Sequence, residues 1–204
     1  MDDEPTDAVP ADEQPSRKRG AYAKGVRRRQ EILDRALEIF SERGYDGTSL
    51  RAIGEAIGVT HAALLHYFPS KEALLIEVLR ERDARSSRVT DAPGLPGLIL
   101  GAEHNATVPG LIALYTSLAG TSADAGNDEA RAYFTERFAR LRGSLAAELA
   151  DAEGRAADAM DERLASLIIA ASDGLQMQWL LDDRVDIAGT LELLQRLMEG
   201  SRGR

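Results

Sequence analysis

The sequence predicts an all-α protein, and three observations lead to this prediction. The strong helix formers Ala and Leu occur 58 times, whereas the β-branched Val and Ile occur 17 times. Apolar residues recur at helical spacing along most of the chain. Glycines, prolines and capping residues stand at the ends of these periodic segments. A chain of 204 residues is long enough to bury one sizeable core or two small ones.

Charge divides the chain into three parts. Residues 1–14 carry a net charge of −6, residues 15–71 carry +5, and residues 72–204 carry −8, which gives −9 in total. One cationic segment therefore lies inside an acidic protein. Seven of its bases fall between Arg17 and Arg29 with no acid among them. Such a run suits either a nucleic-acid contact or a solvated flank before a helix.

Residues 1–20 are expected to form a disordered leader. They contain three of the seven prolines and almost no large apolar side chain, so they cannot bury enough surface to offset the entropy of ordering. A first helix is expected from Lys24, because apolar residues then recur at i, i+3, i+4 and i+7. It should end at Arg43 and Gly44, a cation in the last turn followed by a glycine.

Two short helices are expected next. Thr48 or Ser49 is a suitable N-cap for residues 50–57, and Gly58 ends that helix. Thr60 caps a third helix over residues 61–67. Lys71 begins a fourth helix, which ends before residues 91–97, a segment rich in proline and glycine that we expect to be a linker.

Five further helices complete the prediction. Their expected ranges are 98–107, 109–122, 128–153, 160–184 and 187–199. The stretch 164–181 is apolar over a wide arc, so it needs cover on more than one side. This excess of apolar surface, continued by Leu191, Leu194 and Leu197, predicts dimerisation through the last two helices as a four-helix bundle.

The two short helices, joined by a tight turn around Gly58 and preceded by a basic segment, predict a helix-turn-helix. Two stretches add residue detail: GYDGTSLRAI from Gly44 and GVTHAALLHYFPSKEALL from Gly58. In order and spacing they closely resemble the DNA-binding domain of the TetR family of bacterial transcriptional regulators. The resemblance covers about residues 28–75. It implies a three-helix DNA-binding domain, a linking helix, a variable helical ligand-binding domain and a homodimer.

The resemblance also implies roles for single residues. Thr48 and Lys71 resemble phosphate contacts, and hydroxyls and a lysine at helix N-termini suit phosphate oxygens. Thr60, His61 and Ala62 occupy the leading edge of the recognition helix, and His66 and Tyr67 its other end. Arg27 and Arg28 belong to the basic segment expected to follow the DNA. Thr48 and Thr60 also suit plain N-caps, and the two histidines suit solvent-exposed positions.

An effector site is expected in the C-terminal domain. The candidates are the aromatic and polar residues His104, Tyr115, Tyr133, Phe134, Phe138, Met177, Gln178 and Trp179, with Glu103 and Gln176 as further polar groups. The same aromatic residues also suit a plain core. A mainly apolar cavity in a domain of net charge −8 favours a hydrophobic neutral or cationic molecule.

Other function classes find little support in the sequence. There is no cysteine, Gly-rich phosphate loop, nucleophile elbow or His-Glu-x-x-His motif, and His61 and His66 are five apart, so we expect no enzyme, cofactor or metal. An acidic N-terminus without a long apolar run favours a cytoplasmic protein and no membrane partner.

We therefore expect three regions: a leader (1–20), a helix-turn-helix DNA-binding domain (21–71) and a helical effector-binding and dimerisation domain (72–204). The expected function is a ligand-responsive transcriptional regulator that binds an operator in double-stranded DNA, more readily a repressor than an activator because no activating segment is visible. The alternative, favoured by the net charge of −9, is a helical adaptor of the same fold without sequence-specific DNA binding.

Overall fold

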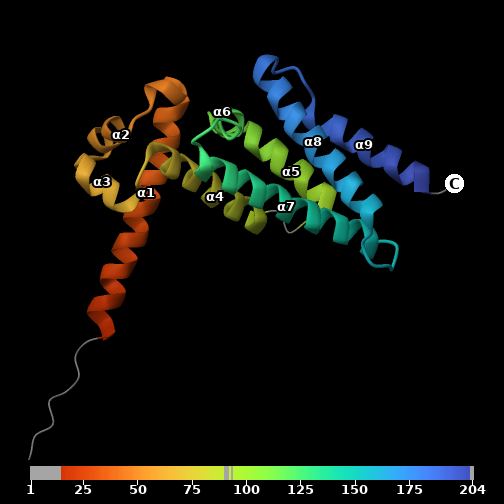
Figure 1. Ribbon diagram of the computed structural model, residues 1–204, viewed down its shortest axis with the longest axis horizontal. Coiled ribbons are helices and arrows are strands. Elements are labelled where there is room, and N and C mark those ends of the chain that lie inside the picture. The colour runs from red at the N-terminus through yellow and green to blue at the C-terminus, as the bar shows by residue number, and fades with distance from the viewer. Residues whose placement is uncertain (1–14, 90–91, 93, 203–204) are drawn as a thin grey trace, which may run out of the picture.

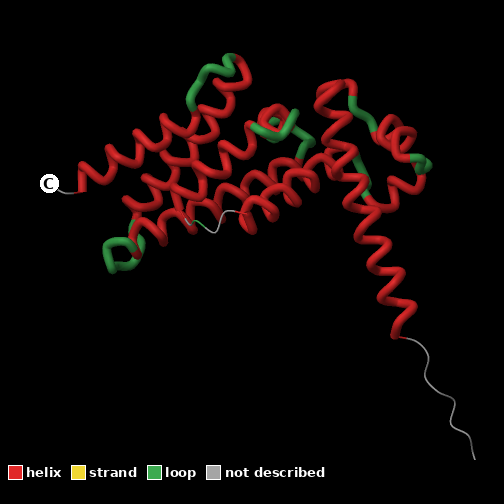
Figure 2. Tube along the Cα trace, turned by 180° about the vertical axis from the view of Figure 1, so that it is seen from behind, coloured by secondary structure: helices red, strands yellow, loops and turns green. Residues whose placement is uncertain are grey.

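The computed structural model describes residues 15–89, 92 and 94–202, and within this part of the chain every regular element is a helix (Figures 1 and 2). The elements in order are α1 (Pro15–Gly47), α2 (Leu50–Ile57), α3 (His61–Tyr67), α4 (Lys71–Val89), α5 (Gly94–Ala106), α6 (Leu111–Thr121), α7 (Asp128–Asp151), α8 (Ala159–Leu181) and α9 (Ile187–Arg202). The all-α prediction is confirmed.

The first helix is longer than its apolar pattern predicted. It begins at Pro15 rather than at Lys24, so residues 15–20 of the expected disordered leader are helical. Residues 1–14 lie outside the described part. Proline suits the first turn of a helix, and the bases that follow are compatible with helix although they offer no apolar periodicity. The predicted end is confirmed, because Gly44 interrupts the helix with a φ of 69°.

The expected linker between α4 and α5 is shorter than predicted. The fifth helix begins at Gly94, so residues 94–97 form its first turn instead of a loop. Pro96 is tolerated there because the first N–H groups of a helix have no partner within the helix. Pro93 falls outside the described residues.

Two hydrophobic cores hold the helices together, and the first crosses the predicted domain boundary at residue 71. It combines Ile32, Leu64 and Leu75 from α1, α3 and α4 with Leu114 of α6 and Phe134 of α7. The second core joins α5, α7, α8 and α9, with Ala165, Ile168 and Leu191 fully or almost fully buried. The N-terminal helices are therefore packed directly against the C-terminal ones.

Helix α8 is the one described helix long and apolar enough to span a membrane by length and composition. It lies along α7 and contributes Ala165, Ile168 and Ile169 to the second core (Figure 1). Its buried residues also include the polar Asp161, Ser172 and Gln176. These properties are those of a core helix.

Candidate nucleic-acid interface and ligand cavity

Capping residues fix both short helices. The Ser49 hydroxyl accepts a hydrogen bond from the Ala52 N–H at 3.1 Å, which makes Ser49 the N-cap of α2. The Thr60 hydroxyl accepts one from the Ala63 N–H, also at 3.1 Å, which confirms Thr60 as the N-cap of α3. Gly58 ends α2 with a φ of 69°, a left-handed conformation that glycine adopts without strain.

Gly54 allows α2 and α3 to approach closely. A Cβ atom at this position would lie 2.8 Å from the Val59 carbonyl oxygen and 3.2 Å from Cδ1 of Leu64. Leu64 is the buried residue of α3, and it seats that helix against α2. The turn geometry therefore depends on the missing side chain of Gly54.

The structure brings most of the predicted recognition residues to one surface. Every residue of α3 except Leu64 is exposed. His61 and Ala62 lie at the N-terminal end of this helix, and His66 and Tyr67 at the other, where the two rings meet edge to face at 5.8 Å. Leu65, also exposed, belongs to the same surface and was not among the predicted residues. Helices α2 and α3 lie together at one end of the molecule (Figure 1).

Thr48 differs from its predicted role. It is only 1% exposed, and its hydroxyl donates a hydrogen bond of 2.7 Å to the Gly44 carbonyl. This geometry withholds the hydroxyl from a phosphate and instead closes the turn between α1 and α2. The exposed polar residues at the start of α2 are Ser49 and Arg51. Among the described residues, Arg51 forms an ion pair only with Glu55, at 3.0 Å.

The consecutive arginines of α1 have different surroundings. Arg27 is exposed, and its side chain makes no hydrogen bond or ion pair within the described part of the chain. Arg28 donates to the Ile57 carbonyl at 2.9 Å and pairs with Glu31, so it caps the C-terminus of α2 from α1. Arg29 pairs with Glu77 and stacks over Phe68. Arg28 thus has a structural role in the described part of the chain, and its contact with DNA stays a prediction.

Lys71 is half-buried at the start of α4. Its ammonium donates to the Tyr45 carbonyl at 3.1 Å and lies 3.7 Å from the centre of the Tyr45 ring. The Tyr45 hydroxyl in turn donates to Glu72 at 2.8 Å. These contacts join the end of α1 to α4. An ammonium has three donors, so two remain for an outside acceptor.

The predicted effector residues do not converge. Tyr133 and Phe134 are buried in the first core, with Phe138 and Tyr115 packed against it. Trp179 packs against the second core, while His104, Met177 and Gln178 are exposed. The expectation of one aromatic pocket is therefore corrected: the aromatic residues of α7 fill the core, and α8 turns Met177 and Gln178 outward.

A cavity of about 370 Å³ lies instead among α5, α7 and α8, close to α4. Among its described lining residues, Leu98, Ala102, Leu141 and Ile169 are apolar, and Asn105, Ser144, Ser172 and Gln176 are polar. Of the predicted polar groups, only Gln176 faces it. The size falls within the range of small-molecule sites.

A hydrogen-bonded cluster of charged groups lines the part of this cavity next to α4. The Arg137 guanidinium bonds to Asp83 at 3.1 Å and to the Tyr115 hydroxyl at 3.2 Å. Tyr115 donates to Asp173 at 2.9 Å. Burial raises the pKa of Asp173. The charge of Arg137 and the hydrogen bond from Tyr115 act in the opposite direction, but the pKa stays raised. Burial also raises the pKa of Tyr115 above its ordinary value, so its hydroxyl stays a donor.

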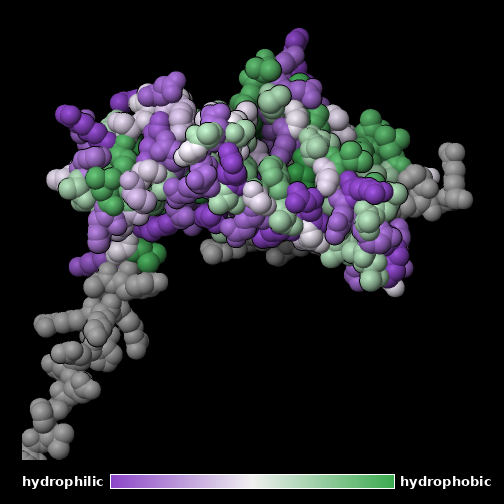
Figure 3. Space-filling view, in the orientation of Figure 1, coloured by the Kyte–Doolittle hydropathy of each residue, from purple (hydrophilic) through white to green (hydrophobic). Residues whose placement is uncertain are grey.

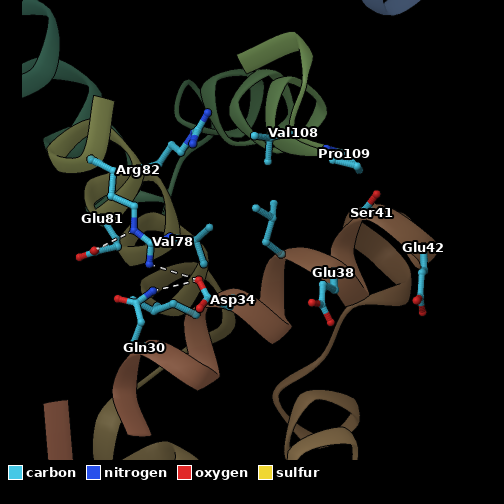
Figure 4. Close-up of a pocket in the computed structure, with 13 residues that line it drawn as sticks. Gln30, Asp34, Glu38, Ser41, Glu42, Val78, Glu81, Arg82, Val108 and Pro109 are labelled. Atoms are coloured by element: carbon cyan, nitrogen blue, oxygen red, sulfur yellow. Dashed lines mark hydrogen bonds and ion pairs between the residues drawn. The ribbon is translucent and has the colours of Figure 1, made fainter. Parts of the chain in front are cut away.

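A second hollow, of about 560 Å³, lies between α1, α4 and the turn before α6 (Figure 4), and we call it the interdomain cleft. Leu33, Leu37, Glu38, Ser41 and Glu42 of α1 line one side; Val78, Glu81, Arg82 and Arg85 of α4 with Val108 and Pro109 line the other. Asp34 of α1 connects the two sides, because it accepts a hydrogen bond from Arg85 of α4 at 3.4 Å. It also accepts one from Gln30 of its own helix at 2.9 Å. No sequence signal marked this cleft.

No three His, Asp or Glu side chains of the described residues lie in positions that could hold a metal ion. The helices and the cavity described above define a class of protein. It is an all-α protein with an exposed recognition helix in a helix-turn-helix and a helical C-terminal domain around a cavity.

Comparisons with known proteins show what the chain is similar to. Residues 32–78 match the model described as bacterial regulatory proteins of the tetR family. The transcriptional repressor AcnR of Corynebacterium efficiens is 38% identical over 78 residues, which are 38% of this chain and 42% of that protein. The regulator RutR of Escherichia coli K12 is 52% identical over 54 residues, 26% of each chain. The chain thus matches less than half the length of these relatives.

Solved structures extend the likeness beyond the DNA-binding domain. A TetR transcription regulator from Haloarcula marismortui superposes with a TM-score of 0.65 at 19% identity, over 81% of this chain and 93% of that one. The regulator FadR from Bacillus subtilis, in complex with stearoyl-CoA, superposes with a TM-score of 0.57 at 19% identity, over 82% and 96%. Residues 32–78 thus match the tetR-family model, and the chain has the fold of these transcription regulators.

Proposed function

We propose that the protein is a cytoplasmic, homodimeric repressor that binds an operator in double-stranded DNA and responds to a small-molecule effector. The exposed surface of α3, set against α2 by Gly54 and Leu64 within the TetR-type domain, carries this proposal. A short helix exposed along its length, apart from one buried anchor, suits insertion into a major groove.

The proposed contacts fall into two kinds. His61, Ala62, His66 and Tyr67 read bases from α3, together with Thr60 at its start. Arg27 and Lys71 bind phosphates, because Arg27 is exposed and Lys71, at the start of α4, keeps unused donors. Thr48 and Arg28 support the domain from within.

Dimerisation is proposed through the outward faces of α8 and α9. Leu167 is 64% exposed and Leu181 85% exposed on α8, and Leu197 is 63% exposed on α9. Hydrophobic side chains are visible over these two helices (Figure 3). Ile168 and Leu191, which the sequence assigned to the interface, are buried in the protomer's own core. A second copy of the chain would cover the exposed set.

The effector is proposed to bind in the cavity among α5, α7 and α8. The stearoyl-CoA complex of the Bacillus subtilis regulator supports a ligand in a fold of this kind. Such a ligand acts only through a difference in affinity between the DNA-bound and free forms. The shared first core offers the route, because α4 and α6 belong to it together with α1.

Selection of genomic fragments by the full-length protein tests the function. We expect one recurrent sequence with two half-sites, and log affinity for it should fall steeply with log salt, by about 0.9 for each phosphate contacted. Uniform affinity for all fragments would favour the adaptor alternative, to which the net charge of −9 points.

A further inference from the structure

Among the described residues, Arg82 forms no ion pair with an acidic side chain. It lies on α4, lines the interdomain cleft (Figure 4) and also reaches a small inner chamber beside the main cavity. Within the described part of the chain, its side chain makes one hydrogen bond, from Nη2 to Oδ1 of Asn105 at 3.4 Å, and no ion pair. The buried Nε has no partner.

The neighbouring charges are already paired. Asp83 receives Arg137 at 3.1 Å, Arg140 at 3.5 Å and the Tyr133 hydroxyl at 3.2 Å. Arg85, one turn further along α4, pairs with Asp34 and Glu81. Arg82 therefore differs from its charged neighbours.

Burial disfavours the charged form of this guanidinium. Desolvation and the nearby Arg85 lower the pKa of Arg82, and only Asp83 opposes them. An arginine nonetheless stays charged at neutral pH. A partly buried cation with an unused N–H donor is an unfavourable arrangement unless an anion arrives to accept from it.

The chamber next to Arg82 has the size of a small head group. Its volume is about 30 Å³, which suffices for about two water molecules. Asn105, Gln176 and three charged residues, Asp83, Arg137 and Asp173, line both this chamber and the main cavity of about 370 Å³. A molecule in the main cavity can thus place one end beside Arg82.

We propose that the effector is a monocarboxylate whose carboxylate accepts hydrogen bonds from Arg82 in the inner chamber, while its apolar part lies against Leu98, Leu141 and Ile169. This inference rests on the proposed function and names the ligand class of its cavity. A carboxylate differs from the neutral or cationic ligand that the net charge of the domain favoured. The groups that line the site decide which ligand binds, and Arg82 is the cation there without an ion pair among the described residues.

A carboxylate fits better than a phosphate. The chamber is small, and Asp83 and Asp173 beside it would repel a second negative charge. The other acid of the cavity, Glu148, lies next to Gly94 at the opposite end of α5. Gly94 and Asn105 are eleven steps apart along the helix, which is about 16 Å at 1.5 Å per step, so Glu148 does not face the head group.

Isothermal titration of the full-length protein at pH 7.5 tests the proposal with octanoate and 3-phenylpropanoate against octanamide and 3-phenylpropanamide. At least one acid should bind about tenfold or more tightly than its amide, as expected for a charge-assisted hydrogen bond in a partly buried site. Arg82→Gln should remove this preference, and Arg82→Lys should restore part of it. Arg85 lies on the same helix but lines neither the inner chamber nor the main cavity, so Arg85→Gln should leave the preference for the acid intact.

Three results would overturn the proposal: equal binding of acids and amides, no binding of either acid, or an acid preference that survives Arg82→Gln in a variant with wild-type thermal unfolding. Tighter binding of octyl phosphate than of octanoate would also contradict it. A gel-shift with the selected operator, carried out without the acids or amides, separates this inference from the proposed function. Operator binding with no acid preference overturns the ligand class alone, whereas loss of operator binding by the wild-type chain overturns the proposed function.

Discussion

Gly54 shows how one missing side chain sets the position of a helix. A methyl group there would lie 2.8 Å from the Val59 carbonyl oxygen, and the backbone cannot yield without moving α3. We expect Gly54→Ala to lower the free energy of unfolding by about 1–3 kcal/mol, the usual cost of overpacking. Urea unfolding followed by circular dichroism measures it.

Gly143 provides the matched control for this substitution. It lies exposed on α7, and a Cβ atom would meet nothing within 4 Å. Gly143→Ala should therefore raise the free energy of unfolding by about 0.5–1 kcal/mol, since alanine has the better helix propensity. Equal effects of the two substitutions would show that the close approach of α2 and α3 carries no energetic weight.

The buried hydroxyl of Thr48 leads to a second prediction. Thr48→Val keeps the shape but removes the donor to the Gly44 carbonyl, so we expect a loss of about 1–2 kcal/mol in the free energy of unfolding. Thr48→Ser retains the hydroxyl and should lose less. If Thr48→Val left the stability unchanged but reduced DNA affinity, the result would support the phosphate contact that the sequence resemblance implied.

At the level of whole elements, the two adjacent arginines of α1 separate binding from folding. Arg27→Ala should leave thermal unfolding unchanged and reduce the slope of log affinity against log salt by about 0.9 per subunit, because an exposed cation beside the DNA is lost. Arg28→Ala should lower stability by about 1 kcal/mol, because the Ile57 carbonyl at the end of α2 loses its cap.

Differential scanning fluorimetry and gel-shift titration at several salt concentrations measure both arginine variants. Each serves as the control for the other, since both remove one charge from the same helix. If Arg28→Ala changed the salt slope while Arg27→Ala changed stability, the assignment would be reversed.

Helix ends were predictable where a local signal marks them. Thr60 and the glycines at 44 and 58 cap their helices through contacts within a few residues, and the sequence alone locates them. The start of α1 was missed because residues 15–23 have no apolar periodicity, and Pro96 was taken for a loop residue although it lies in the first turn of α5. Thr48 and Ser49 were equivalent candidates until the fold buried one of them.

The ligand cavity could not be predicted in the same way. Which faces of α5, α7 and α8 meet depends on contacts between residues far apart in the chain, and a list of aromatic residues carries no such information. Tyr133 and Phe134 look like pocket residues in sequence but fill the first core. Arg82 was not among the predicted site residues, and only its neighbours in the structure distinguish it.

Across the whole molecule, the first core links helices α1–α4 to helices α6 and α7. Leu75 and Leu79 of α4 pack in the same cluster as Leu118 of α6 and residues of α1. Arg82 follows Leu79 along α4 and reaches the inner chamber. A ligand bound at Arg82 therefore contacts the helix that leads directly from the helix-turn-helix, and a shift of α4 would move the recognition helix with it.

The dimer proposal gives the last prediction. Leu167 and Leu197 are both more than 60% exposed, so replacing them leaves the protomer's two cores intact. The double variant Leu167→Glu and Leu197→Glu would place charges on an apolar face that must be desolvated in a dimer, which costs several kcal/mol. We expect it to sediment as a monomer with a native circular dichroism spectrum. It should also bind a two-half-site operator far more weakly, because the two recognition helices are no longer linked.

A control with the same added charge isolates the interface from general repulsion. Thr135→Glu with Ala139→Glu adds two acids to exposed positions of α7. Neither residue belongs to the exposed apolar set of α8 and α9, so this variant should remain dimeric and keep its operator affinity. Sedimentation velocity distinguishes the two species by mass. A dimer in the first variant, or a monomer in the second, would mean that the chain pairs through another face, and the spacing of its two recognition helices would then differ from that of an α8–α9 dimer.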